Sequence, residues 1–151
     1  MSQVFVSGHK SPDTDSIAAA LSYSYLKRRL GMDAVAVRAG EINKESRFAL
    51  DYFNLEEPML VTSVARKNPE DEKQKVILVD HNESKQTIDG MDDAEVLEII
   101  DHHRFGDFES ENPIFILVRP VGCVNTVIYG LYKANHIKPT REIAGIMLSA
   151  I

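Results

Sequence analysis

Three short segments of the chain concentrate carboxylates and imidazoles, the side chains that most often bind catalytic metal ions. They have the sequences GHKSPDTDS at residues 8–16, VDHNE at residues 79–83 and IIDHHR at residues 99–104. Aspartate and histidine together favour a borderline transition metal such as manganese, cobalt or zinc over calcium, which prefers oxygen ligands alone. Since no thiolate accompanies them, a structural zinc site is not expected.

Each of these segments follows a mostly apolar run that predicts a buried strand, at residues 4–6, 75–79 and 96–100. In an open parallel sheet, ligands bind outside the carboxyl ends of the strands. We therefore expect the three segments to meet at one edge of a sheet. There they would bring together six candidate ligands: His9, Asp13, Asp15, Asp80, His102 and His103.

Carboxylates can also bridge two divalent ions, which lie ~3.5–4 Å apart in enzymes that transfer phosphoryl groups. Asp13 and Asp15 lie in one loop and can each serve a different ion, whereas Asp80 stands alone at its strand end as the expected bridge. A hydroxide between the ions would attack a phosphoanhydride, because metal binding lowers its pKa. His81 and Asn82 are expected to orient the loop or to support the ligands.

Simpler interpretations exist for several of these residues. Asp13 is well placed to be the N-cap of the following helix, and the consecutive histidines could belong to an ordinary turn. Asn125 and Thr126 lie near the start of a predicted helix, where they either meet an anion or act as caps. Cys123 has no base near it in the sequence and is expected to be a packed thiol. The joint occurrence of all three segments favours the metal site.

The elements that must position these residues alternate between strands and helices. Helices are predicted at residues 16–30, 43–53, 122–135 and 139–151, and strands at residues 4–6, 34–38, 59–61, 75–79, 96–100 and 114–118. This order indicates one α/β domain of residues 1–151, with a mostly parallel sheet and helices on both faces. The apolar run at residues 147–151 ends without a cap or polar tail, so we expect the chain to be part of a longer protein.

The composition argues against several classes of partner. The chain carries 17 basic and 23 acidic residues, a formal net charge of −6, which disfavours broad electrostatic binding to nucleic acid. No apolar run approaches the ~20 residues that span a bilayer, and no signal peptide begins the chain, so no membrane partner is expected. The single cysteine fits a reducing compartment, and the expected location is the cytoplasm.

The three motifs in this order resemble those of the DHH phosphoesterase superfamily, and within it the N-terminal DHH domain of family II inorganic pyrophosphatases. The segment PVGC at residues 120–123 and the helix at residues 142–151 fit the same family, so the resemblance covers essentially the whole chain. It implies a hydrolase with a Rossmann-like DHH domain, two Mn²⁺ or Co²⁺ ions per complete site, and Mg²⁺ entering with the substrate. It also implies the hydrolysis of pyrophosphate to two phosphates, and a homodimer formed through this domain.

The resemblance further assigns metal-binding roles to five motif residues. His9 and Asp13 would hold one ion. Asp15 and His102 would hold the second ion, and Asp80 would bridge the two.

Two other residues of the third motif receive roles beside the ions. His103 would face the substrate and stabilise the phosphate, so His103 and Asp80 are the expected catalytic residues, and Asp101 would support the site. The family completes the second metal site with an aspartate that lies beyond this chain. It also grips pyrophosphate with the lysines and arginines of a C-terminal domain that is absent here. Residues 1–151 alone are therefore expected to be nearly inactive.

Two other functions stay open at this point. Another DHH phosphoesterase would share the metal centre but would need basic and aromatic surfaces for bases; examples are a RecJ-like exonuclease and a phosphodiesterase for oligonucleotides or cyclic dinucleotides. A non-catalytic regulatory domain would keep the metal ligands without turnover. The acidic balance and the PDTD form of the first motif favour pyrophosphate.

Overall fold

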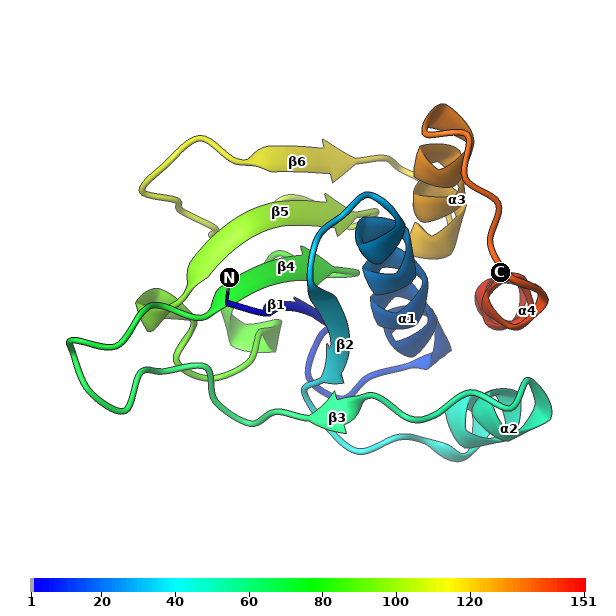
Figure 1. Cartoon of the computed structure of the whole chain (residues 1–151), viewed down its shortest axis with the longest axis horizontal. Helices are drawn as coiled ribbons and strands as arrows, with labels where there is room; N and C mark the ends of the chain where they lie inside the picture. Colours follow the sequence, from blue (N-terminus) through cyan, green and yellow to red (C-terminus); the bar gives the residue numbers. More distant parts are fainter. Residues whose placement is uncertain (1) are drawn as a thin grey trace.

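Six parallel strands form one sheet in the computed structural model, which describes residues 2–151. Their order is β3-β2-β1-β4-β5-β6, so the chain runs outward in both directions from the central pair β1 and β4 (Figure 1). The crevice where the order reverses is where open α/β sheets bind ligands. The strands are β1 (Val4–Ser7), β2 (Ala34–Arg38), β3 (Met59–Leu60), β4 (Lys75–Val79), β5 (Glu95–Asp101) and β6 (Phe115–Val118).

Four α-helices and two short 3₁₀ helices complete the described residues: α1 (Thr14–Arg29), α2 (Lys44–Tyr52), α3 (Val124–Ala134), α4 (Arg141–Ala150), η1 (Ser84–Gln86) and η2 (Met91–Asp93). The starts of α1, α2 and α4 are capped, because the side chains of Asp13, Asn43 and Thr140 accept hydrogen bonds from their first turns. Within residues 2–151, no helix combines the length and apolar character that crossing a membrane requires.

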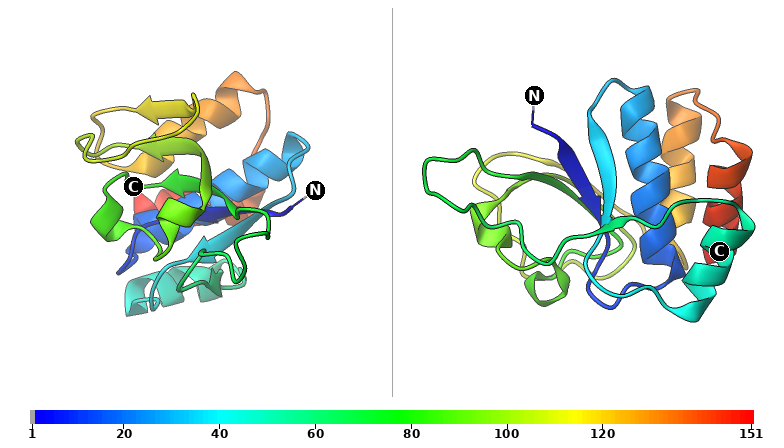
Figure 2. Two further views of the ribbon diagram at one scale, coloured as in Figure 1. Left: turned by 90° about the vertical axis from the view of Figure 1, so that its left-hand side faces the viewer. Right: turned by 60° about the horizontal axis from the view of Figure 1, so that its bottom comes forward.

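The α/β class and the parallel sheet are confirmed, but the two faces of the sheet are covered differently. α1 and α3 pack on one face of the sheet. α4 packs against α1 and α3 on their side away from the strands, and α2 packs against α1 and α4 (Figure 2). The other face is covered by loops with η1 and η2, where Val64 and Ile88 pack on the strands. Right-handed crossovers explain the split, because moving outward from β4 to β5 sends that connection to the face opposite α1. In residues 2–151 this connection forms only 3₁₀ turns, so α-helices cover one face and not both.

The register of the strands aligns the loops that carry the three motifs. Ser7 lies beside Leu78, and Val79 lies beside Ile100, so β1, β4 and β5 end at the same level. Because parallel strands share a direction, the loops that follow them leave from one edge of the sheet. The expected meeting of the three motifs is therefore a direct result of the sheet register.

Candidate metal centre

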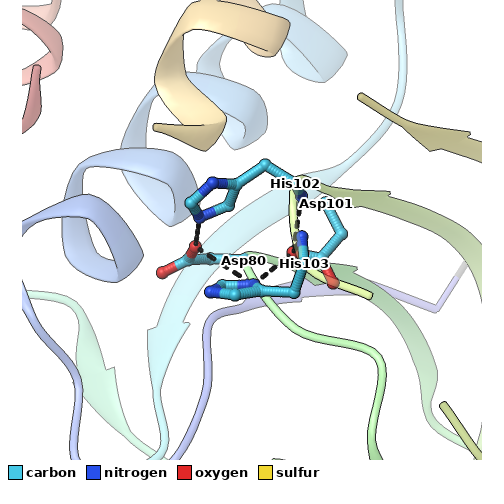
Figure 3. A group of neighbouring side chains, drawn as sticks. All are labelled: Asp80, Asp101, His102 and His103. Atoms are coloured by element: carbon cyan, nitrogen blue, oxygen red, sulfur yellow. Dashed lines mark hydrogen bonds and ion pairs between the residues drawn. The ribbon is translucent and has the colours of Figure 1, made fainter. Parts of the chain in front are cut away.

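Asp80 lies at the centre of the cluster, immediately after β4. It is 1% exposed, and its Oδ1 lies 3.0 Å from His102 Nε2 while its Oδ2 lies 3.3 Å from His9 Nε2. Figure 3 shows His102 reaching the Asp80 carboxylate from the end of β5. The Asp80 backbone has a φ of 62°, a left-handed conformation that residues other than glycine seldom adopt. Such conformations concentrate at functional sites.

The first motif supplies His9 and Asp13 to one side of Asp80. His9 Nε2 lies 3.7 Å from Asp13 Oδ1, and the ligand atoms of His9, Asp13 and Asp80 all lie within 4.8 Å of one another. His9 Nδ1 lies 2.7 Å from the carbonyl of Lys10. A carbonyl only accepts, so Nδ1 donates to it, and Nε2 is the ring nitrogen that faces the carboxylates.

Asp15 and His102 form the matching group on the other side of Asp80. His102 Nε2 lies 3.5 Å from Asp15 Oδ2, and its Nδ1 donates to the carbonyl of Val121 at 2.7 Å. This bond fixes the His102 tautomer in the same way as the Lys10 carbonyl fixes that of His9. Asp80 therefore offers one oxygen to each of two groups that each contain one histidine and one further aspartate.

Asp101 supports the cluster, and both of its oxygens accept hydrogen bonds from neighbouring groups. It is fully buried, and its Oδ1 accepts bonds from the backbone N–H of His102 at 2.7 Å and from His103 Nδ1 at 2.7 Å. Its Oδ2 accepts a bond from Asn82 Nδ2 at 2.7 Å. With Nδ1 held in this way, the His103 side chain is 49% exposed and its Nε2 is free to meet a substrate.

His81 is placed beside the cluster but is not positioned as a ligand. Its Nδ1 donates to the carbonyl of Val79 at 2.9 Å, and its ring meets that of His9 edge to face. Burial lowers the pKa of His81 to about 4, so the ring is neutral near pH 7. Within residues 2–151 its buried Nε2 has no hydrogen-bond partner.

The charges of the cluster suit a cation. Burial raises the pKa of Asp80 to about 6. Burial opposes the charged form of His9, but hydrogen bonds to Asp13 and Asp80 outweigh it and raise the pKa of His9 to about 10. The bond from His9 lowers the pKa of Asp13 to about 2. Protons thus stay on the imidazole that the carboxylates surround, and a divalent ion would displace them, as metal binding does at such ligands.

The donor set therefore fits a borderline divalent ion, as the sequence predicts. The structure brings all six candidate ligands to one edge of the sheet, and Asp13 also caps α1, so both interpretations of that residue hold together. Sequence reasoning missed the carbonyls of Lys10 and Val121, because backbone groups leave no signal in residue types. It also gave Cys123 no role, although the Cys123 thiol donates to Asp15 Oδ1 at 2.7 Å. Burial raises the pKa of this thiol to about 12, so it stays protonated.

Several known proteins that are similar to this chain are named as manganese-dependent enzymes. A "probable manganese-dependent inorganic pyrophosphatase" of Bacillus licheniformis is 51% identical over all 151 residues, and one of an Exiguobacterium species is 49% identical. The chain spans about half the length of these relatives, 47% of each. A solved structure of Methanococcus jannaschii, described as a candidate family II inorganic pyrophosphatase, is 36% identical and superposes with a TM-score of 0.85. That match covers 98% of this chain and 47% of the other.

The family comparison covers nearly every residue. The model of the DHH family, N-terminal domain, matches residues 3–151 and so includes all three motifs, the sheet and the four α-helices. The chain belongs to the DHH family and carries its N-terminal domain.

Proposed function

We propose that the protein hydrolyses inorganic pyrophosphate to two phosphates at a centre of two divalent ions, with Mn²⁺ as the natural metal. The observation that carries the proposal is the Asp80 carboxylate, whose two oxygens each face one histidine, His9 at 3.3 Å and His102 at 3.0 Å. A buried carboxylate shared by two ligand groups is what a bridged pair of ions needs. The names of the relatives support manganese and pyrophosphate.

In this proposal the metal ligands divide into two groups around Asp80. His9 and Asp13 hold one ion, and Asp15 and His102 hold the other. When bound, the ions would lower the pKa of water and neutralise charge on the phosphates. The protein's own part is to hold both imidazoles with Nε2 inward, through the bonds of their Nδ1 atoms to backbone carbonyls.

His103 is proposed to contact the substrate. Its Nδ1 is held by the buried Asp101 and lies 4.0 Å from Asp80 Oδ1, and its half-exposed ring leaves Nε2 free for a substrate (Figure 3). A donor held in place at a developing negative charge costs no reorganisation during the reaction. We propose that His103, with a proton on both ring nitrogens, donates from Nε2 to a phosphate oxygen, while Asp101 accepts from Nδ1 and, with Asn82, keeps the ring in position.

Residues 2–151 offer few cations for a highly charged substrate. Near the cluster, Lys10 pairs with Asp89 and Arg104 pairs with Glu83. Phosphoryl transfer relies strongly on cationic clamps. We therefore propose that further cations from beyond residue 151 grip pyrophosphate, and that residues 1–151 alone have little turnover.

A phosphate-release assay tests the proposed activity. The complete gene product is expected to release phosphate from pyrophosphate with Mn²⁺ and not to cleave a short oligonucleotide or a cyclic dinucleotide under the same conditions. Asp80→Asn should lower the rate by more than about 100-fold, since changes to residues behind metal ligands already cost 10–100-fold. Cleavage of the nucleotides in place of pyrophosphate would identify another phosphoesterase. Unchanged activity of Asp80→Asn would contradict the metal-centre mechanism.

Other expected properties belong to the same proposal. Co²⁺ is proposed as an alternative metal and Mg²⁺ as the ion that accompanies the substrate, because both meet the donor preferences of such sites. A homodimer through this domain is supported by β6, an edge strand on which Phe115 is 50% exposed and Ile116 is 42% exposed. A cytoplasmic location is supported by the one free thiol of Cys123.

A further inference from the structure

The side-chain carboxylate of Asp15 accepts four hydrogen bonds, which all come from residues at the start of α3. Its Oδ1 accepts from Cys123 Sγ at 2.7 Å, from Asn125 Nδ2 at 2.6 Å and from Asn125 N at 3.3 Å. Its Oδ2 accepts from Val124 N at 2.9 Å. The anion that the start of α3 meets is therefore a carboxylate of the protein's own metal cluster.

These bonds leave the two oxygens of Asp15 in different states. A carboxylate has about four lone-pair directions, two on each oxygen. Three donors crowd Oδ1, whereas Oδ2 has one donor and lies 3.5 Å from His102 Nε2. Only Oδ2 can still accept a ligand, so Asp15 can meet an ion through one oxygen and on the side of His102.

The orientation of the Asn125 amide is fixed from its other end. Asn125 Oδ1 accepts a bond from Ser22 Oγ at 3.1 Å, so Nδ2 must point to Asp15. The same Nδ2 donates to the backbone carbonyl of Asp15 at 3.0 Å. Asn125 and Ser22 are both fully buried, so water does not compete for these bonds. All the donors to Asp15 are uncharged, which leaves its negative charge for the ion.

We propose that Asn125 and Cys123 are positioning residues for the metal position shared by Asp15 and His102, and that they restrict Asp15 to one-oxygen ligation. This inference rests on the proposed metal centre. The alternative is that the same bonds merely tie α3 to α1. A change at Tyr132 distinguishes the positioning role from a purely structural one. The buried Tyr132 hydroxyl donates to the Ser22 carbonyl in the same interface between α3 and α1, but this bond does not involve Asp15.

The test measures Mn²⁺ affinity and thermal stability in the complete gene product, by calorimetric titration and thermal unfolding. Asn125→Ser should weaken Mn²⁺ binding at one of two positions by about 10- to 100-fold and leave the other unchanged. Cys123→Ala should cause a measurable loss of at most about tenfold, because a thiol is a weak donor, and Cys123→Ser should restore the affinity. Tyr132→Phe should lower the unfolding temperature but leave both Mn²⁺ affinities at their wild-type values.

Each other outcome is informative. Wild-type affinity at both positions in Asn125→Ser, or a Tyr132→Phe variant that loses as much Mn²⁺ affinity, would overturn the positioning role. If Asn125→Ser does not fold, equal affinities of Cys123→Ala and wild type would overturn it. A wild-type protein that binds Mn²⁺ but does not release phosphate would leave the positioning role intact and contradict the proposed function. A wild-type protein that binds no Mn²⁺ would overturn both.

Discussion

Replacing Asp101 with asparagine tests the support beneath the two histidines. The fully buried carboxylate accepts bonds from His102 N, His103 N and His103 Nδ1 on Oδ1, and from Asn82 Nδ2 on Oδ2. The amide oxygen of Asp101→Asn can serve the three donors on one side. Its NH₂ group must then face Asn82 Nδ2. Two donors would therefore lie opposite each other at the 2.7 Å that now separates Asn82 Nδ2 from Asp101 Oδ2.

The size of the effect follows from these bonds. A hydrogen bond to a charged group contributes about 1.5–3 kcal/mol, and a buried donor left without an acceptor costs about 1–3 kcal/mol. We expect Asp101→Asn to lower the free energy of unfolding by about 2–5 kcal/mol. At about 2–4 °C per kcal/mol for a chain of this size, the unfolding temperature should fall by about 4–20 °C. The measurement is thermal unfolding followed by circular dichroism.

A reciprocal variant serves as the control. Combining Asp101→Asn with Asn82→Asp restores an acceptor opposite the new NH₂ group, so the double variant should recover part of the lost stability. The recovery is incomplete, because Asn82 Nδ2 also donates to the Arg104 carbonyl. An Asp101→Asn variant that unfolds within about 1 °C of wild type, or a double variant no better than the sum of the single ones, would refute this reasoning.

Two further predictions concern residues beside the cluster. In Gly8→Ala, the new Cβ would lie 1.9 Å from Ser16 Oγ, so we expect the free energy of unfolding to fall by about 1–3 kcal/mol. Adding Ser16→Gly should recover part of this loss. A Gly8→Ala variant with the stability of wild type would contradict the close packing. The pKa of His81 lies near 4 in the folded state and near 6.5 in the unfolded state, so the unfolded chain binds the proton first as the pH falls. The contribution of His81 to the free energy of unfolding is therefore complete above pH 6.5 and falls by about 3 kcal/mol as the pH drops to 4. Metal-free wild type compared with His81→Asn in urea titrations at several pH values isolates this contribution, and equal pH profiles would contradict it.

The sequence was sufficient to predict the strands that carry the site. Residues 76–79 form an uninterrupted apolar run that Asp80 follows, and this pattern is typical of a central parallel strand that ends at a ligand. The N-caps Asp13 and Asn43 were equally predictable, because their side chains bond locally to backbone N–H groups three residues later.

What could not be predicted depends on long-range packing or on backbone groups. The second face of the sheet is covered by loops because crossover handedness, a tertiary property, sends residues 80–94 there. The contact between Cys123 and Asp15 joins residues 108 positions apart, and neither residue type predicts a contact with the other. α3 begins at Val124 and not at residue 122, because Cys123 keeps an extended backbone with a φ of −154°.

In the proposed centre, Asp80 joins two ions. Electron paramagnetic resonance of the complete gene product, loaded with Mn²⁺, measures this directly. Two ions ~3.5–4 Å apart couple magnetically, so we expect two Mn²⁺ per chain with an exchange-coupled spectrum that is lost in Asp80→Asn. One bound ion per chain, or two ions with uncoupled spectra in the wild type, would contradict it.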